Sequence, residues 1–151
     1  MFALPNKTIF YTIERAIKEY RQFAQKQISE KFDDITVDQA MILILIAKHP
    51  DMSQDDLGKS SFKGKASVTR MIDLLIDHGY LERKTHETDR RRFRLIPSQK
   101  GQSALDELIE IIKANRKIAL QDIQRSDIIL IDSILGKLIS NCHNETLKSS
   151  T

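Results

Sequence analysis

The sequence has little of several residue types on which whole classes of protein depend. Cys142 is the only cysteine among 151 residues, so no disulfide can form within the chain, and a reducing compartment is expected. With 5 Gly and 3 Pro, turn-forming residues are too few for an all-β sandwich. The longest apolar stretch, residues 40–47, is far shorter than the ~20 residues of a membrane span, and the N-terminus does not resemble a secretory signal. These absences favour a helical protein of the cytoplasm.

The positive charge is concentrated in the middle third of the chain. The whole sequence has a net charge of +3. Residues 53–100 contain eleven Lys and Arg against seven Asp and Glu, so this third holds the entire excess. Solvated surfaces also gather charge, but a local excess is typical of a region that faces phosphate.

Helical periodicity dominates both ends of the chain. Residues 7–29 are predicted to form a helix with two apolar stripes, and Thr36 is the expected N-cap of a core helix, apolar on all sides, that ends at Pro50. Ser98 and Ser126 are the expected N-caps of the last two helices, and residues 144–151 are expected to fray. The stripes of the first helix are Phe10, Ile13, Ile17, Tyr20 and Ala24, and Phe2, Ile9, Ala16 and Phe23; that of the last is Ile128, Ile131, Leu135, Leu138 and Cys142.

The middle of the chain has the order of elements of a winged helix-turn-helix. Two helices, residues 53–59 and 65–78, are separated by a turn at 62–64, and Gly79 ends the second. Strands at 80–86 and 92–96 then form a hairpin with its tip at 87–91. The second helix would read base edges in the major groove of DNA while the first crosses the backbone. The alternative is an ordinary amphipathic helix with a solvated face. The candidate DNA contacts here are Ser53, Lys63, Lys65, Ser67, Thr69 and Arg70.

The hairpin is unusually rich in arginine. Arg90, Arg91, Arg92 and Arg94 lie at its tip or just after it, where like charges repel unless an anion neutralises them. We expect Arg91 to enter the minor groove, held by a bidentate ion pair with Asp89, while Arg92 and Arg94 grip phosphates. Alternation places Arg92 and Arg94 on one face and Phe93 and Leu95 on the other. The alternative is a solvated turn.

These segments resemble the multiple-antibiotic-resistance regulator (MarR) family. The resemblance covers residues 36–104 and lies in the stretch from Lys65 to Lys84, the wing motif Asp89-Arg90-Arg91 and the helix start Ser98-Gln-Lys-Gly101. Thr36 to Gln39 resembles the opening of the family's second helix. Pro97 departs from the family pattern, in which leucine precedes the cap.

The resemblance implies a mainly α fold with a small β-hairpin wing. It implies one domain, in which a winged helix-turn-helix lobe at about 36–97 is flanked by dimerisation helices at about 7–29 and 98–144. The two apolar stripes of the first helix agree with a homodimer. The implied function is a transcriptional regulator, in the usual case a repressor, that binds a palindromic operator in double-stranded DNA. A small aromatic or phenolic effector is also implied, and the residues that could line its cleft are Tyr11, Tyr20, Phe23 and Met41.

Other functions find less support in the sequence. A winged helix can also serve as a protein-interaction adaptor, although an adaptor does not need a projecting arginine wing. The four histidines are scattered, so we expect no metal site, and we expect no cofactor. No phosphate-binding glycine loop or Ser/His/Asp arrangement indicates an enzyme.

Overall fold

The chain divides into two compact units, residues 1–116 and 117–151. The computed structural model describes residues 4–91 and 93–149, so Phe2 and Arg92 lie outside the described residues. Six α-helices and one two-stranded antiparallel sheet lie in the described part, which confirms the expected fold class. The elements are η1 (Pro5–Lys7), α1 (Ile9–Ser29), α2 (Val37–Lys48), α3 (Gln54–Ser61), α4 (Lys65–Asp77), β1 (Leu81–Thr85), β2 (Phe93–Pro97), α5 (Gln99–Ala119) and α6 (Arg125–Ser149).

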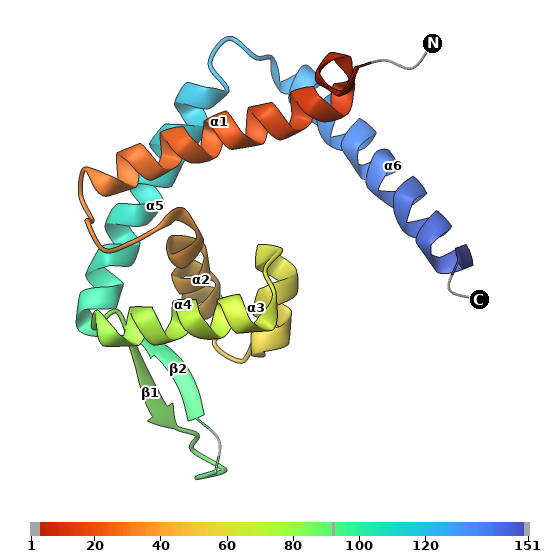
Figure 1. Cartoon of the computed structure of the whole chain (residues 1–151). Helices are drawn as coiled ribbons and strands as arrows, with labels where there is room; N and C mark the ends of the chain where they lie inside the picture. The colour runs from red at the N-terminus through yellow and green to blue at the C-terminus, as the bar shows by residue number, and fades with distance from the viewer. Residues whose placement is uncertain (1–3, 92, 150–151) are drawn as a thin grey trace. The chain divides into compact units, whose positions relative to one another are not determined.

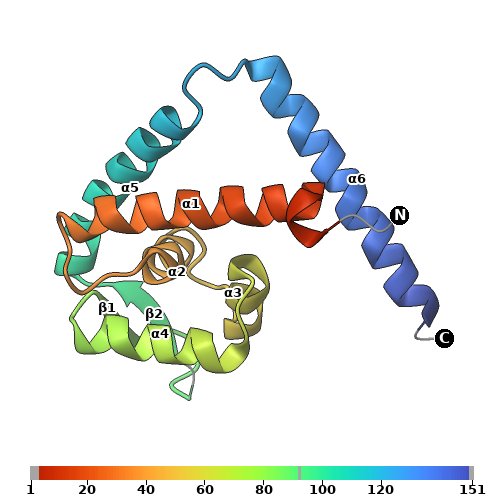
Figure 2. The ribbon, with the colours of Figure 1, turned by 45° about the horizontal axis from the view of Figure 1, so that its top comes forward.

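Helix α2 lies at the centre of the first unit. Thr36 caps it with a reciprocal pair of bonds: the Gln39 amide N–H donates to Thr36 Oγ1 at 3.2 Å, and the Thr36 amide N–H donates to Gln39 Oε1 at 2.8 Å. Figure 2 shows α2 between α1 on one side and α3 and α4 on the other, and β2 also contacts it. The expected core helix is therefore confirmed, with Ile42 and Leu43 completely buried.

The hairpin follows α4 and projects away from α2, α3 and α4 (Figure 1). Leu81 pairs with Pro97 and Thr85 with Phe93. The first strand is therefore one residue shorter at each end than predicted, and the second is shifted by one residue toward the C-terminus. Pro97 is tolerated because the sheet has only two strands and both are edges. Leu95 packs on the core as expected, but Phe93 is 68% exposed because it lies at the distal end of the ladder, near the tip.

The last helix differs from its prediction at both ends. It begins at Arg125, so Ser126 lies within its first turn and is not its N-cap. The Gln124 carbonyl instead accepts hydrogen bonds from the backbone N–H groups of Asp127 and Ile128. The helix continues to Ser149, so the expectation of a frayed tail from Asn144 was wrong for the described residues.

The start of α5 is joined to the end of α4 by three consecutive carbonyl groups. Lys100 Nζ donates to the His78 carbonyl at 2.7 Å, Ser98 Oγ to the Gly79 carbonyl at 2.5 Å, and the Ser98 N–H to the Tyr80 carbonyl at 3.0 Å. A Cβ atom on Gly101 would lie 2.0 Å from the Tyr80 carbonyl oxygen, so only glycine fits there. No helix in the described part of the chain combines the length and apolarity of a membrane span.

Replacing Gly101 with alanine is expected to destabilise the protein strongly. The added methyl must displace the Tyr80 carbonyl and its hydrogen bond to Ser98, at a cost of about 3 kcal/mol in the free energy of unfolding. Urea denaturation measures the change. Gly136→Ala is the matched control, because nothing lies within 4 Å of its Cβ position in α6, and it should stabilise the helix slightly. Equal effects of the two substitutions would contradict the steric argument.

Candidate nucleic-acid interface

Helix α3 begins with a capping box and ends in a tight turn. Ser53 Oγ accepts a hydrogen bond from the Asp56 N–H at 3.1 Å, and the Ser53 N–H donates back to Asp56 Oδ2 at 3.3 Å. This bonding lowers the pKa of Asp56. Gly58 allows the close approach of the turn, because a Cβ there would lie 2.8 Å from the Lys63 carbonyl oxygen. Ser53, a candidate phosphate contact, is exposed and its hydroxyl is engaged in the cap.

The two helices of the helix-turn-helix end in the same hydrogen-bonded cap. At the end of α4 the Tyr80 N–H donates to the Leu75 carbonyl at 2.8 Å, and the Gly79 N–H donates to the Ile76 carbonyl at 2.9 Å. At the end of α3 the Lys63 and Phe62 N–H groups make the corresponding bonds, at 2.9 and 3.4 Å. This is the Schellman arrangement, in which the residue whose N–H donates to the carbonyl three positions earlier has a left-handed backbone. Gly79 has φ +79°, as predicted from sequence, and Phe62 has φ 57°.

Helix α4 buries one face and exposes the other. Val68, Ile72 and Leu75 are buried in the core. Gly64, and not a side chain, occupies the N-cap. The opposite face forms a shallow open groove, and Ser67 is also exposed beside it. The groove is lined by Lys65, Ala66, Thr69, Arg70, Asp73, Leu74 and Asp77.

The candidate base-reading side chains on this face differ in whether they have ion-pair or hydrogen-bond partners within the protein. Arg70 is exposed and makes no ion pair with any described residue. Lys65 lies 3.7 Å from Asp55 in an exposed pair that costs little to break. Thr69 is half-buried, and its hydroxyl lies 3.0 Å from Gln54 Oε1 on α3 and 3.0 Å from a backbone carbonyl of α4. Arg70 is therefore the side chain best placed to bind a base, while Thr69 joins the two helices.

Lys63 is engaged inside the protein. Its Nζ lies 3.1 Å from Asp38 Oδ2, and Arg21 of α1 holds the other oxygen of Asp38 at 2.6 Å. Burial alone would raise the pKa of Asp38, but the hydrogen bonds and charges of Arg21 and Lys63 outweigh it and lower that pKa. The carboxylate thus connects α1, α2 and the turn before α4. Neither the Lys63–Asp38 pair nor the Arg21–Asp38 pair was predicted from sequence, because the paired residues lie far apart along the chain and no local pattern links them.

At the hairpin tip, Asp89 does not make the expected ion pair with Arg91. Its Oδ1 accepts a hydrogen bond from the Arg91 backbone N–H at 3.0 Å, and no ion pair joins the two side chains in the described part of the chain. A carboxylate two residues before an N–H closes a local turn more readily than it reaches along a side chain. Arg90 and Arg91 are exposed, and Arg92 lies outside the described residues.

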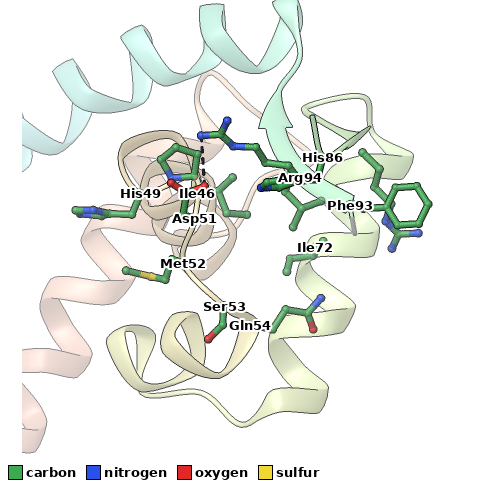
Figure 3. Close-up of a pocket in the computed structure, with 13 residues that line it drawn as sticks. Ile46, His49, Asp51, Met52, Ser53, Gln54, Ile72, His86, Phe93 and Arg94 are labelled. Atoms are coloured by element: carbon green, nitrogen blue, oxygen red, sulfur yellow. Dashed lines mark ion pairs between the residues drawn. The ribbon is translucent and has the colours of Figure 1, made fainter. Parts of the chain in front are cut away.

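Arg94 turns back toward the body of the first unit (Figure 3). Its Nη2 lies 3.5 Å from Asp51 Oδ1, and its buried Nε has no hydrogen-bond partner in the described residues. It borders a pocket of about 650 Å³ between the end of α2, the start of α3 and the hairpin. The labelled residues in Figure 3 include His49, Met52, Ser53, Gln54 and His86. Arg94 is thus less available to phosphate than Arg90 or Arg91.

The candidate effector residues lie on two helices of the first unit. Tyr11, Tyr20 and Phe23 lie on α1, and Met41 lies on α2. Tyr11 and Met41 are exposed, whereas Tyr20 and Phe23 are half-buried. The pocket described above is lined by other residues.

The root of the wing is fixed by Asp34, which precedes α2. Tyr80 donates its hydroxyl proton to Asp34 Oδ1 at 2.7 Å, and burial together with this carboxylate raises the pKa of Tyr80. Lys100 Nζ lies 4.1 Å from the centre of the Tyr80 ring and 3.9 Å from Asp34. On β1, Arg83 Nη2 lies 3.1 Å from Asp73 Oδ1 of α4. These contacts set the angle between the hairpin and α4.

Comparison with known proteins finds one matching family for the middle of the chain. A profile described as the MarR family matches residues 33–92, which span the end of the α1–α2 loop to the hairpin tip. Residues 33–92 thus match the MarR family, and the resemblance predicted from sequence is confirmed for this segment. The chain as a whole has the fold of MarR-family transcriptional regulators.

Solved structures of MarR-family proteins match nearly the whole chain. A MarR protein from Peptoclostridium difficile is 21% identical, with a TM-score of 0.78 and coverage of 98% of this chain and 96% of that one. BpsR from Bordetella bronchiseptica, whose DNA binding is regulated by 6-hydroxynicotinic acid, is 17% identical, with a TM-score of 0.77 and coverage of 91% and 97%. A SlyA-like regulator from Listeria monocytogenes is 17% identical, with a TM-score of 0.73 and coverage of 96% and 92%. At these identities the likeness shows the fold.

Asp38 is expected to make stability depend on pH. Its pKa is lowered by folding, so the stabilisation is complete above the unfolded-state pKa of about 3.9 and is lost as the pH falls through the folded-state value. Asp38→Asn should lower the free energy of unfolding by about 1 kcal/mol at pH 7 and by much less near pH 3. Urea titrations at both values test this. Asp55→Asn, which removes only the exposed pair with Lys65, is the control and should change stability little at either pH.

Proposed function

We propose that the protein is a homodimeric transcriptional repressor that binds a palindromic operator in double-stranded DNA. The observation that carries the proposal is the pairing of an exposed α4 face, centred on Arg70, with the exposed arginines of the hairpin tip, on a MarR-family winged helix. A helix fits the major groove, and an arginine tip suits the narrower minor groove beside it. Repression follows if the bound dimer blocks access to a promoter.

The exposed apolar residues of α1 and α6 support a dimer. On α1, Ile9, Phe10 and Ile17 are each more than half exposed. Large exposed apolar patches are uncommon on monomeric proteins and mark interaction surfaces. A symmetric dimer would cover them and would place two copies of α4 at a spacing that a palindrome can match. The corresponding exposed residues of α6 are Ile129, Leu130, Ile131, Ile134 and Ile139.

We further propose a small aromatic acid as effector. The support is the match of residues 33–92 to the MarR family and the regulation of BpsR by 6-hydroxynicotinic acid. Tyr11, Tyr20, Phe23 and Met41 remain the candidate contacts. Such an acid releases the operator only if it binds the free form of the protein more tightly than the DNA-bound form.

The α4 face and the wing should make separable contributions to DNA binding. The probe is a duplex selected by the wild-type protein from a random-sequence library, compared with its scrambled version at two salt concentrations. Arg70→Ala should cost about 1–3 kcal/mol on the selected duplex and relax sequence preference at one symmetric pair of positions. Arg91→Ala should weaken binding strongly and alter preference only near the wing, because the minor groove distinguishes little beyond A·T from G·C.

Lys113→Ala is the matched control for these variants. It removes an exposed cation from α5, outside the helix-turn-helix and the hairpin, and should leave affinity and salt dependence unchanged. If Arg70→Ala and Arg91→Ala both bind the selected duplex as the wild type does, the groove-reading mechanism is wrong. That outcome would favour the adaptor function.

The dimer is expected to be stable at micromolar concentration. Obligate interfaces of this kind bury roughly 2,000 Å² or more. Sedimentation equilibrium should give twice the 17.4 kDa mass of the chain. Leu135→Asp places a charge beside the apolar side chains of α6 and should dissociate the dimer, whereas Lys137→Asp on the same helix should not. A wild-type protein that sediments as the monomer would contradict the proposal.

A further inference from the structure

Phe62 combines two unfavourable properties in the turn between α3 and α4. Its side chain is 95% exposed, so the ring contributes almost nothing to the core. Its backbone is left-handed, with φ 57° and ψ 33°, a conformation that bulky residues rarely adopt. Stability within the monomer therefore does not explain a phenylalanine at this position. Strained backbone at an exposed residue is commonly found at functional sites.

The cap of α4 shows what the same position requires for folding alone. Gly79 and Phe62 occupy equivalent positions in the two Schellman caps, with the same pair of backbone hydrogen bonds. Glycine adopts the left-handed conformation without steric cost, and it is the usual residue there. The ring of Phe62 is thus dispensable for the turn.

The surroundings of Phe62 fit a polyanion. Lys59 and Lys65, both exposed, lie three residues from it on either side. Phe62 is separated from the first residue of α4 only by Lys63 and Gly64, and α4 then presents the exposed face that carries Arg70. A DNA duplex lying against that face would have its backbone near these lysines and the edge of its major groove near the turn.

We propose that Phe62 is a specificity-determining residue whose ring packs against the C5-methyl group of a thymine at the edge of the major groove. This inference rests on the proposed DNA-binding function. Phenylalanine is one of the side chains that make apolar contact with the thymine methyl, the one apolar group that bases display in this groove. The ring is already exposed before DNA binds, so no contact within the protein has to be broken when it meets a base.

The test uses the selected duplex and four variants of the full-length protein. Phe62→Gly and Phe62→Asn suit the left-handed backbone and remove the ring, and Phe62→Tyr keeps it. Phe93→Ala removes the other exposed phenylalanine of the first unit's DNA-facing elements and is the control. Each protein is titrated with the thymine duplex and with duplexes in which single symmetric pairs of thymines are replaced by deoxyuridine, which lacks only the methyl group.

The wild type should lose about fourfold in affinity per half-site, equivalent to about 0.8 kcal/mol, when deoxyuridine replaces the contacted thymine. Phe62→Gly and Phe62→Asn should bind the thymine duplex about 16-fold more weakly as dimers and should no longer distinguish the two duplexes. Phe62→Tyr and Phe93→Ala should keep the distinction. The melting temperature of Phe62→Gly should not fall, since glycine relieves the strain.

Several results would overturn the inference. The first is binding of Phe62→Gly as tight as that of the wild type. The second is a fall in its affinity with the sensitivity to deoxyuridine unchanged, which would indicate a sugar or phosphate contact. Dissociation of the Phe62→Gly dimer in sedimentation would instead assign the ring to a subunit interface. Failure of the wild type to select any duplex would contradict the proposed function itself and is thereby distinguishable from failure of this inference.

Discussion

The burial of most of α2 is the constraint on which the packing of the first unit depends. A helix that carries apolar residues around most of its circumference is unstable at a surface, so other elements must pack around it. Here α1, α3, α4 and β2 all contact it, and Ile42 and Leu43 have no exposed surface. Because α3 and α4 both pack on this one helix, the angle between them follows from its side chains. The exposed face of α4 is consequently the face that does not pack toward α2.

The cations of the middle third fall into two groups. Lys63, Arg83 and Arg94 each have a carboxylate partner within the first unit, whereas Arg70, Arg90 and Arg91 have no ion-pair partner in the described residues. A cation that already has a carboxylate partner must give up that partner to bind phosphate, so it adds less to DNA affinity than a cation without one. The density of positive charge along the sequence therefore overstates the number of side chains available to DNA.

The extent to which the sequence predicted the structure depended on the range of the interaction. Caps such as those at Thr36 and Gly79 are local, because a side chain or a backbone torsion acts within four residues, and they were predicted correctly. The ion pairs of Lys63 with Asp38 and of Arg94 with Asp51 join distant segments, and nothing in the sequence pattern indicates them. Asp89 is intermediate between these cases. Its partner residue, Arg91, was predicted correctly, but Asp89 binds the backbone N–H of Arg91 and not the guanidinium group. Glycine is the usual residue at the left-handed position that Phe62 occupies. The phenylalanine there is therefore a local departure that is visible in the sequence.

The three carbonyl groups of His78, Gly79 and Tyr80 that bond to the start of α5 also determine where the chain can change in length. An inserted residue in this segment would break all three bonds and move α4 relative to the hairpin. The hairpin tip carries no such restraint, since the hydrogen bonds of residues 86–91 to other described residues stay within this segment. Evolution can therefore lengthen or shorten the tip, and so vary its reach along DNA, while the orientation of the recognition helix stays constant.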